Sequence, residues 1–352
     1  MIDTDEKLAA YLPVVTAADW IAVDTEADSL HAYPEKVCLI QISTSAGDRL
    51  IDPLADLDFN RLLDALSGHK LIMHAADYDL RLLSKHHAFA PAAIFDTMLA
   101  ARLLGYREFG LAALVEKLLA VKLDKGPQKA DWARRPLTER MEIYARNDTH
   151  YLRRLANHLT RELTSKHRLD WHHEWCARLI KECARPLPVD LDLVWRIKGS
   201  HALNRAGLAA LRELWQWRED EAMAANRPPF FILAHEKMIA IAEAAAARQP
   251  IEPSFPRHLS PRRREGIAKA IKAAYLRPAD TFPEVLRNRV RRPTEAERRR
   301  YHELEQRRDA AAHAMEIDAT IIASRSTLGD LARDWDKYAP ELMKWQRHLL
   351  QA

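Results

Sequence analysis

The sequence predicts an α/β domain, with a mixed sheet flanked by helices, followed by all-α helical domains. Three observations support this division. Short apolar runs alternate with helical patterns over roughly the first 100 of the 352 residues, and helical patterns continue almost alone from about residue 108. The chain has 18 prolines against 9 glycines, so prolines mark most of the breaks. A chain of this length is expected to hold two or three domains.

Five apolar runs in the first part predict strands, and three helical patterns lie between or after them. The strands are expected at 20–24, 37–42, 49–51, 70–73 and 93–95, and the helices near 59–66, 78–85 and 97–104. The first three strands are joined by connections too short for crossover helices, so they should be antiparallel. The last two lie beside helices and can be parallel.

Composition and charge narrow the class of protein. No run of 18 or more apolar residues occurs, and the N-terminal segment lacks the apolar stretch of a signal peptide, so we expect a cytoplasmic protein with no membrane association. Three cysteines (Cys38, Cys176 and Cys183) without C-x-x-C spacing or paired histidines predict neither a disulfide framework nor a zinc site. We interpret them as buried or incidental thiols.

Positive charge is concentrated in residues 257–308. This segment has 16 Lys and Arg against 7 Asp and Glu, a local charge of +9 in a chain of net charge +4. The segment contains Arg262–Arg264, Arg287, Arg289, Arg291, Arg292 and Arg298–Arg300. Arginine-rich segments attract phosphates without sequence preference, which suits an enzyme that holds a polyanion. Solvated helix faces and a linker are the alternative interpretation.

Four acidic residues and one tyrosine are the candidate functional residues. Asp24 and Glu26 stand two apart in and after the first strand, so their side chains share a face. Tyr144 and Asp148 stand four apart in a helical pattern over 138–159, so they share a helix face. Asp79 opens the apolar-periodic stretch after the strand at 70–73.

A cluster of carboxylates predicts a metal centre. Carboxylate oxygens are hard ligands suited to Mg²⁺ or Mn²⁺, and clustered negative charge is costly unless a cation occupies the space between. Two such ions in one site catalyse phosphodiester hydrolysis in many nucleases. The sequence therefore indicates two-metal phosphodiester chemistry, provided that these distant residues converge in the fold.

Three motifs carry a resemblance to a known family. DTE at 24–26, HxxxxD at 74–79 and YxxxD at 144–148 resemble, in this order, the motifs of the DEDDy family of 3′-5′ exonucleases, of which the ribonuclease D type is the nearest match. Each motif alone is weak, but the intervening segments 37–44, 50–53, 95–105 and 131–148 are similar as well. The resemblance covers residues 1–195 and implies a ribonuclease-H-like exonuclease domain.

The resemblance also implies site roles and a substrate. Asp24, Glu26 and Asp148 would hold one divalent ion, and Asp24 with Asp79 a second, so that two ions, Mg²⁺ or Mn²⁺, serve one site. Tyr144 would orient the attacking water or help to deprotonate it, although a phenol with a pKa near 10 is a poor base by itself. The expected activity is that of a 3′-5′ exoribonuclease releasing nucleoside 5′-monophosphates. The expected substrates are tRNA precursors and other structured small RNAs with single-stranded 3′ ends.

Two helical segments follow the nuclease part. Residues 200–285 resemble a helicase-and-RNase-D C-terminal (HRDC) domain, with a Trp-rich helix, a Pro-Pro break and a second amphipathic helix. Residues 290–352 repeat this pattern more faintly, and we interpret them as a second, degenerate HRDC-like unit. An ordinary helical bundle without a ligand of its own is the alternative for both, since aromatic residues at helical spacing are more often core than base-stacking platforms.

Several residues near the motifs have structural interpretations. Asp77 and Asp96 each precede or open a helical stretch and are predicted to be helix caps rather than ligands. His74 could touch a phosphate or serve as a buried, hydrogen-bonded histidine. Ala75 departs from the commoner His-Asn of the family, so any substrate contact by that Asn is absent. Gln41 is expected to be structural.

The segment KGPQKADW at 125–132 is expected to form a loop near the site. Lys125, Gln128, Lys129 and Trp132 are candidates for direct RNA contact there.

Two alternative functions stay open on the sequence. A DNA 3′-5′ exonuclease similar to those associated with RecQ-type helicases has the same modules, although this chain has no G-x-x-x-x-G-K-[ST] loop and cannot itself be such a helicase. A nucleic-acid-binding protein without catalysis is the other, but all five site positions hold residues that the chemistry requires.

Overall fold

The computed structural model describes residues 1–185, 190–286 and 291–351. The predicted basic residues Arg287 and Arg289 lie outside the described residues. The chain forms two compact units, one of Met1–Ala27, Val37–Pro186 and Arg291–Ala352 and the other of Asp28–Lys36 and Leu187–Val290. Each unit has its own hydrophobic core.

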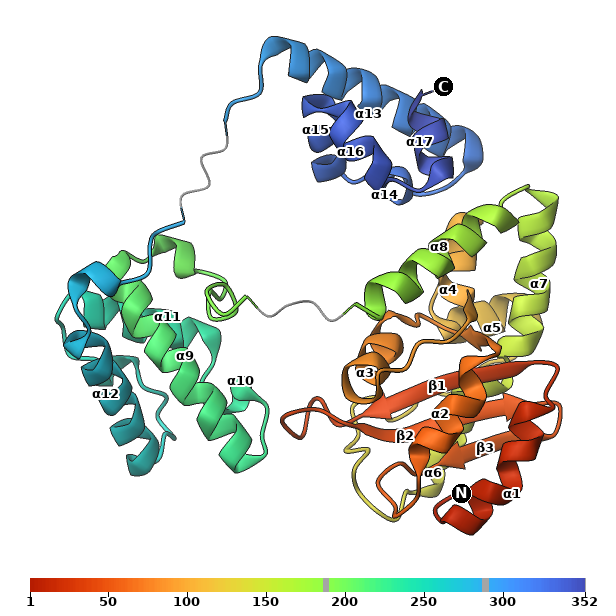
Figure 1. The fold of residues 1–352 in the computed structure, drawn as a ribbon, viewed down its shortest axis with the longest axis horizontal. Coiled ribbons are helices and arrows are strands. Elements are labelled where there is room, and N and C mark those ends of the chain that lie inside the picture. The colour runs from red at the N-terminus through yellow and green to blue at the C-terminus, as the bar shows by residue number, and fades with distance from the viewer. Residues whose placement is uncertain (186–189, 287–290, 352) are drawn as a thin grey trace. The chain divides into compact units, whose positions relative to one another are not determined.

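The first unit contains a five-stranded mixed sheet in the order β3-β2-β1-β4-β5 (Figure 1). The strands are β1 (Ile21–Ala27), β2 (Val37–Thr44), β3 (Gly47–Ile51), β4 (Lys70–Met73) and β5 (Ala93–Asp96). The pairs β1–β2 and β2–β3 are antiparallel, and β1–β4 and β4–β5 are parallel. The predicted mixed sheet and its strand directions are thus confirmed. β2 is buried along its whole length, as expected of a strand covered on both faces.

Helices cover both faces of this sheet. They are α1 (Asp5–Thr16), α2 (Phe59–Ser67), α3 (Asp77–His87), α4 (Thr97–Leu103), α5 (Leu111–Leu119), α6 (Glu139–His150), α7 (Leu152–Ser165) and α8 (Leu169–Cys183). α6 packs against β1, β2 and β3, and α8 packs against β5. The helical pattern over 138–159 predicted one segment, whereas the structure ends α6 at His150 and begins α7 at Leu152, with Tyr151 between them.

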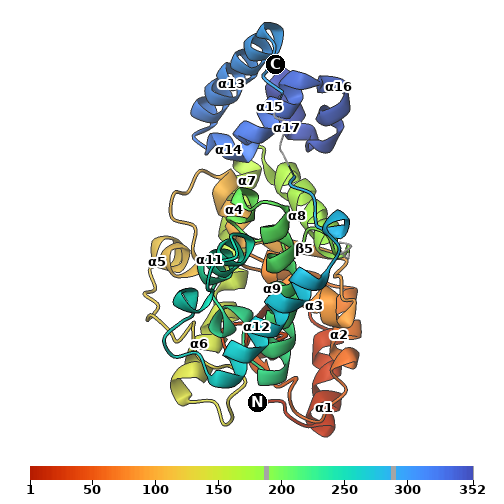
Figure 2. The same ribbon diagram turned by 90° about the vertical axis from the view of Figure 1, so that its left-hand side faces the viewer.

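The second unit is a helical bundle in which α9 packs against both α11 and α12 (Figures 1 and 2). Its helices are α9 (Arg205–Ala225), α10 (Pro229–Ile232), α11 (His235–Ala246) and α12 (Pro261–Leu276). Leu211, Leu214, Met238 and Ile267 are among its buried core residues.

The C-terminal helices belong to the first unit. They are α13 (Glu295–Met315), α14 (Ala319–Ile322), α15 (Arg325–Arg333), α16 (Trp335–Tyr338) and α17 (Lys344–Gln351). The buried guanidinium of Arg168 donates hydrogen bonds to the carbonyl oxygens of Leu103 (2.7 Å) and Met315 (2.9 Å), and the rings of Trp171 and Trp345 stack 4.8 Å apart. These contacts join α13 and α17 to the nuclease part of the same unit.

The two helical segments repeat one pattern at a constant offset of 90 residues. α9 and α13 are both 21 residues long, each ends in a left-handed C-cap, at Asn226 and Glu316, and each is followed by a four-residue helix, α10 or α14. Arg218 and Arg308 occupy the same position in the repeat; both are buried, and each pairs with the acidic residue that follows it. Matching caps and matching buried arginines are more specific than helical periodicity, which any bundle shares.

Cys38, Cys176 and Cys183 are free and buried. Over the described ranges, no helix combines the length and the apolar character needed to cross a membrane.

Candidate metal centre

β1 presents Asp24 and Glu26 at the end of its parallel pairing. β1 pairs with β4 only at Ile21 and Ala22, while its antiparallel pairing with β2 continues to Ala27. Asp24 and Glu26 therefore lie beyond the last β4 pair, on one face of the strand because side chains alternate along it. This leaves space beside β1 that other elements can enter.

α6 supplies the other ligand candidate of this group. Its N-cap, Thr138, accepts a hydrogen bond from the backbone N–H of Met141, and the helix places Tyr144 and Asp148 one turn apart on one face. One carboxylate oxygen from each of Asp24, Glu26 and Asp148 lies within 4.8 Å of the others. The fold thus brings together acids that are more than a hundred positions apart in the sequence.

Asp79 lies outside this group of three but next to it. Its side chain is 6% exposed, and its carboxylate accepts a hydrogen bond from the hydroxyl of Thr25. The negative charge of Asp79 is nevertheless close enough to contribute to the raised pKa values of Asp24 and Glu26. Thr25 points away from Asp24, because neighbouring side chains alternate along a strand.

Asp96 holds the turn that leads into α3 and Asp79. It is fully buried, and its carboxylate accepts hydrogen bonds from the backbone N–H groups of Ala75 (3.2 Å), Ala76 (2.8 Å), Met98 (2.8 Å) and Leu99 (3.1 Å). The prediction that Asp96 caps a helix is confirmed at α4. Asp96 also holds the left-handed turn at Ala75 (φ 57°), and this role was not predicted. The turn after β4 and the end of β5 are neighbours only through the pairing of these two strands.

The electrostatics of the cluster call for a cation. Burial and then the charges of neighbouring acids raise the pKa of Asp24 well above its ordinary value and that of Glu26 to about 9. Burial is also the main cause that raises the pKa of Asp148 to about 7 and that of Asp79 to about 6. Like charges held this close destabilise each other's ionised form unless a cation lies between them.

A divalent metal fits the donor set. The Oδ2 atom of Asp148 is buried and has no hydrogen-bond partner among the described residues. An unpaired buried carboxylate oxygen carries a free-energy cost that a metal ligand does not. Asp24, Glu26 and Asp148 offer only oxygen ligands, the type that Mg²⁺ and Mn²⁺ prefer.

Tyr144 completes the group through its hydroxyl. The hydroxyl is hydrogen-bonded to the side chains of Asp148 and Gln128, and the ring lies 6.0 Å from that of Trp132. Burial, followed by the charges of Asp148 and Glu26, raises the pKa of the phenol. Tyr144 is therefore protonated at neutral pH and can orient a water molecule or a phosphate oxygen by hydrogen bonding, but it cannot serve as a base in this state.

The neighbouring residues have structural contacts. His74 Nδ1 forms a hydrogen bond of 2.8 Å with the hydroxyl of Thr97. The prediction that Asp77 is a helix cap was wrong: it is the first residue of α3, the N-cap is Ala76, and the Asp77 carboxylate pairs with Arg81 at 2.9 Å. An acidic residue is favourable in the first turn without acting as the cap, since it faces the positive end of the helix dipole.

The loop at 125–132 lies beside Tyr144, but not all of it is available to a ligand. Trp132 is 1% exposed and belongs to a core cluster with Leu39, Leu50 and Met141, so the expectation of a direct RNA contact by Trp132 was wrong. The signal in the sequence was the placement of a single Trp between polar residues, which does not distinguish a core anchor from a surface ring.

The structural role expected of Gln41 stays a prediction. Gln41 faces Asp24 across the β1–β2 pairing and is fully buried, and neither its Nε2 nor its Oε1 has a partner among the described residues. The sequence shows this feature as one amide side chain inside the apolar run VCLIQIST, where a buried polar group is expected.

A cavity of about 550 Å³ opens beside the tyrosine. Lys122, Lys125, Gly126, Arg140, Ile143, Tyr144, Asn147 and Tyr151 are among the residues that line it. The lining combines three cations and two aromatic rings with two acidic residues, Asp124 and Glu139. Cations together with rings suit a nucleotide chain.

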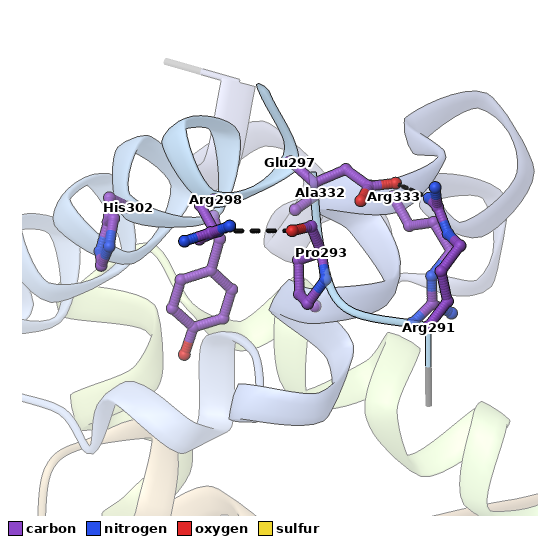
Figure 3. Close-up of a pocket in the computed structure, with 9 residues that line it drawn as sticks. Arg291, Pro293, Glu297, Arg298, His302, Ala332 and Arg333 are labelled. Carbon is purple, nitrogen blue, oxygen red and sulfur yellow. Dashed lines mark hydrogen bonds and ion pairs between the residues drawn. The ribbon is translucent and has the colours of Figure 1, made fainter. Parts of the chain in front are cut away.

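A second cavity, of about 290 Å³, lies in the C-terminal segment (Figure 3). Arg298 Nε donates a hydrogen bond to the carbonyl oxygen of Pro293 (3.3 Å), and Arg291 pairs with Glu297. Arg333, also in the lining, pairs with Asp330 at 3.1 Å. Arg291, a member of the predicted basic segment, thus has its charge neutralised within the protein.

Comparisons with known proteins agree with the interpretation of this cluster as an exonuclease site. A family model described as "3'-5' exonuclease" matches residues 1–164, and a model of the HRDC domain matches residues 207–249. Ribonuclease D of Zymomonas mobilis is 36% identical over 259 residues, which are 71% of this chain and 65% of that protein. The exosome complex component 10 homolog of Caenorhabditis elegans is 34% identical over 249 residues, which are 69% of this chain and 28% of that protein. The chain thus spans less than two thirds of the length of these relatives.

Solved structures share the fold. The crystal structure of Escherichia coli RNase D, titled "an exoribonuclease involved in structured RNA processing", aligns with a TM-score of 0.76 and 25% identity over 100% of this chain and 98% of that chain. The catalytic core of RRP6 from Trypanosoma brucei aligns with a TM-score of 0.66 and 26% identity, over 78% of this chain and 79% of that chain. The chain therefore has a 3′-5′ exonuclease domain followed by an HRDC domain, and it is similar to ribonuclease D over most of its length.

Proposed function

We propose that this protein is a 3′-5′ exoribonuclease that removes nucleoside 5′-monophosphates one at a time from RNA. One observation carries the proposal: one carboxylate oxygen from each of Asp24, Glu26 and Asp148 lies within 4.8 Å of the others. The raised pKa values of Asp24 and Glu26 and the unpaired Asp148 oxygen make cation binding favourable at this cluster.

The proposed site uses two divalent ions, Mg²⁺ or Mn²⁺. Asp24, Glu26 and Asp148 would hold one, and Asp24 with Asp79 the other, Asp79 acting directly or through water. Such ions supply Lewis-acid activation of water and neutralise charge at the scissile phosphate. The chain's own contribution is orientation: the protonated Tyr144 hydroxyl, held by Asp148 and Gln128, would orient the attacking water.

The proposed substrates are tRNA precursors and other structured RNAs that end in a single-stranded 3′ tail. Similarity to E. coli RNase D, an exoribonuclease involved in structured RNA processing, supports an RNA substrate. The cavity lined by Lys122, Lys125 and Tyr151 offers cations and a ring for a single strand.

The helical segments are proposed to hold the RNA. We assign residues 1–195 to the exonuclease domain, 200–285 to the HRDC domain and 290–352 to a second HRDC-like unit. The 90-residue repeat of helices, caps and buried arginines supports the second assignment.

A turnover assay tests the proposal. A tRNA with a 3′ extension and a single-stranded DNA of equal length are incubated with the protein at matched Mg²⁺ and salt, with and without EDTA, and the products are sized. Shortening of the RNA by single nucleotides, abolished by EDTA and by Asp24→Asn, is expected. Preferential shortening of the DNA would favour the DNA exonuclease alternative, and binding without products would contradict catalysis.

A further inference from the structure

We infer that Gly126 is a positioning residue for the Tyr144 hydroxyl. The inference rests on the proposed role of Tyr144 in RNA hydrolysis and concerns a residue outside the acidic motifs. Two observations carry it, the close approach of the Gly126 backbone to the ring and the hydrogen bonds that hold the hydroxyl.

The backbone of Gly126 lies against the Tyr144 ring near its Cδ2 atom. A Cβ atom at position 126 would lie 1.6 Å from Cδ2 and 2.4 Å from both Cγ and Cε2 of Tyr144. Real Cβ contacts need more than 3 Å. The obstacle is the rigid ring rather than the end of a flexible chain, so either the ring or the loop would have to move by roughly 1–2 Å, the difference between these distances and ordinary van der Waals contact.

The ring has little freedom to retreat. It packs beside the buried ring of Trp132 and belongs to the edge of the core cluster around Met141 and Ala145. Tyr144 is also in the interior of α6, so its Cα cannot shift without moving Asp148 one turn later. A side chain at position 126 would therefore rotate the phenol away from its present place.

The hydroxyl at the far end of the ring is fixed from two sides. Gln128, two residues after Gly126, is hydrogen-bonded to it from the loop, and Asp148 from α6. The loop thus supplies both the space for the ring and a partner for its hydroxyl. Moving the ring or the loop would break this arrangement at the carboxylate cluster.

Position 126 requires glycine because of the space beside the ring and not because of its backbone conformation, as at Gly266 beside Trp217. Gly47, Gly105 and Gly199 have positive φ angles, whereas Gly126 does not, so its backbone conformation is open to any residue. Gly110 has nothing within 4 Å of an added Cβ and serves as a matched control.

The experiment is a double-mutant cycle on a single-stranded oligoribonucleotide in Mg²⁺. Gly126→Ala should lower kcat by about 10- to 100-fold, the effect of misplacing a reacting group by about 1 Å, while KM changes less than about 3-fold. Tyr144→Phe should lower kcat as well, and Gly126→Ala added to Tyr144→Phe should cause little further loss, because the hydroxyl is already gone. Gly110→Ala should keep the activity of the unmodified protein.

Each outcome decides one point. Equal fold losses from Gly126→Ala with and without the Tyr144 hydroxyl would overturn the inference, and so would full activity of Gly126→Ala. Full activity of Tyr144→Phe would instead overturn the role of Tyr144 in the proposed function.

Thermal unfolding separates positioning from a general loss of stability. The Tm lost through Gly126→Ala should be recovered in the Tyr144→Ala background, where no ring remains to collide with the added Cβ. Failure to recover would also contradict the inference.

Discussion

The hydroxyl of Thr25 donates a hydrogen bond to the carboxylate of Asp79 and so ties β1 to the first turn of α3. The two residues are 54 positions apart. This bond, together with burial at 6% exposure, gives the Asp79 side chain one orientation next to the three clustered carboxylates. A residue facing away from Asp24 along the strand thereby supports the same site.

Thr25→Val should weaken metal binding without disturbing the strand. Valine keeps the shape and β-branching of threonine but removes the donor that lowers the pKa of Asp79. Residues that orient ligands typically contribute about 10- to 100-fold. We expect a loss of that size in kcat/KM at limiting Mg²⁺, measured over a Mg²⁺ titration. Thr25→Ser, which keeps the hydroxyl, should retain most activity; equal losses in both variants would contradict the role of the hydrogen bond.

Asp24→Asn should abolish hydrolysis and stabilise the metal-free protein. The folded state raises the pKa of Asp24, so its ionised form destabilises the fold at neutral pH, and a neutral side chain removes that repulsion. We expect activity to fall by more than about 100-fold, above the usual effect of a supporting residue, while Tm in EDTA rises. The exposed Asp56→Asn is the control. A lower Tm for Asp24→Asn in EDTA would show that the acids do not repel one another.

Mg²⁺ or Mn²⁺ should raise the Tm of the protein, and EDTA should reverse the effect. A ligand that binds only the folded state stabilises it by about 2.7 kcal/mol at 100 times its Kd. Asp148→Asn should lose most of this increase because the substitution removes a member of the cluster. Thermal shift over a metal titration measures it. An equal increase in both proteins would place the binding elsewhere.

Asp96→Ala should destabilise the fold and reduce activity together. The substitution leaves four backbone N–H groups without their acceptor, two at the start of α4 and two in the turn before α3. Each buried unpaired group costs about 1–3 kcal/mol, whereas removal of an exposed cap costs about 1 kcal/mol. Urea unfolding should therefore show a larger loss for Asp96→Ala than for Ser260→Ala, which caps α12 at the surface. Similar losses would contradict the double role of Asp96.

His172 should make the stability depend on pH between about 6.5 and 4. It is fully buried, its Nε2–H donates to the carbonyl oxygen of Asp96 (3.0 Å), and burial lowers its pKa to about 4. Below pH 6.5 the unfolded chain binds a proton that the folded chain does not, so stability falls as pH falls. The difference amounts to about 2 kcal/mol between pH 7.5 and pH 5.

Urea unfolding at these two pH values measures the effect of His172. His172→Gln should lose about 2 kcal/mol less than the unmodified protein on going to pH 5. The exposed His86→Gln is the control and should behave like the unmodified protein. Equal pH dependence of all three proteins would show that His172 is not the cause.

The sequence by itself determined the local elements and the residue types of the site. Five short apolar runs predicted all five strands, and the short connections between the first three predicted that these are antiparallel. Strand formation and short connections both depend on residues that are neighbours in the chain. Asp24 with Glu26, and Tyr144 with Asp148, could be paired on faces from strand and helix periods alone.

Only the tertiary structure decided how distant segments meet. It separated Asp79 from the group of three carboxylates, gave Asp96 a second set of hydrogen-bond donors, buried Trp132, and pressed Gly126 against the ring of Tyr144. These relationships join segments that are not neighbours in the chain, and periodicity carries no information about them. Steric fit and the satisfaction of buried hydrogen bonds are properties of the packed molecule, so they could be read only once the sheet and its helices were assembled.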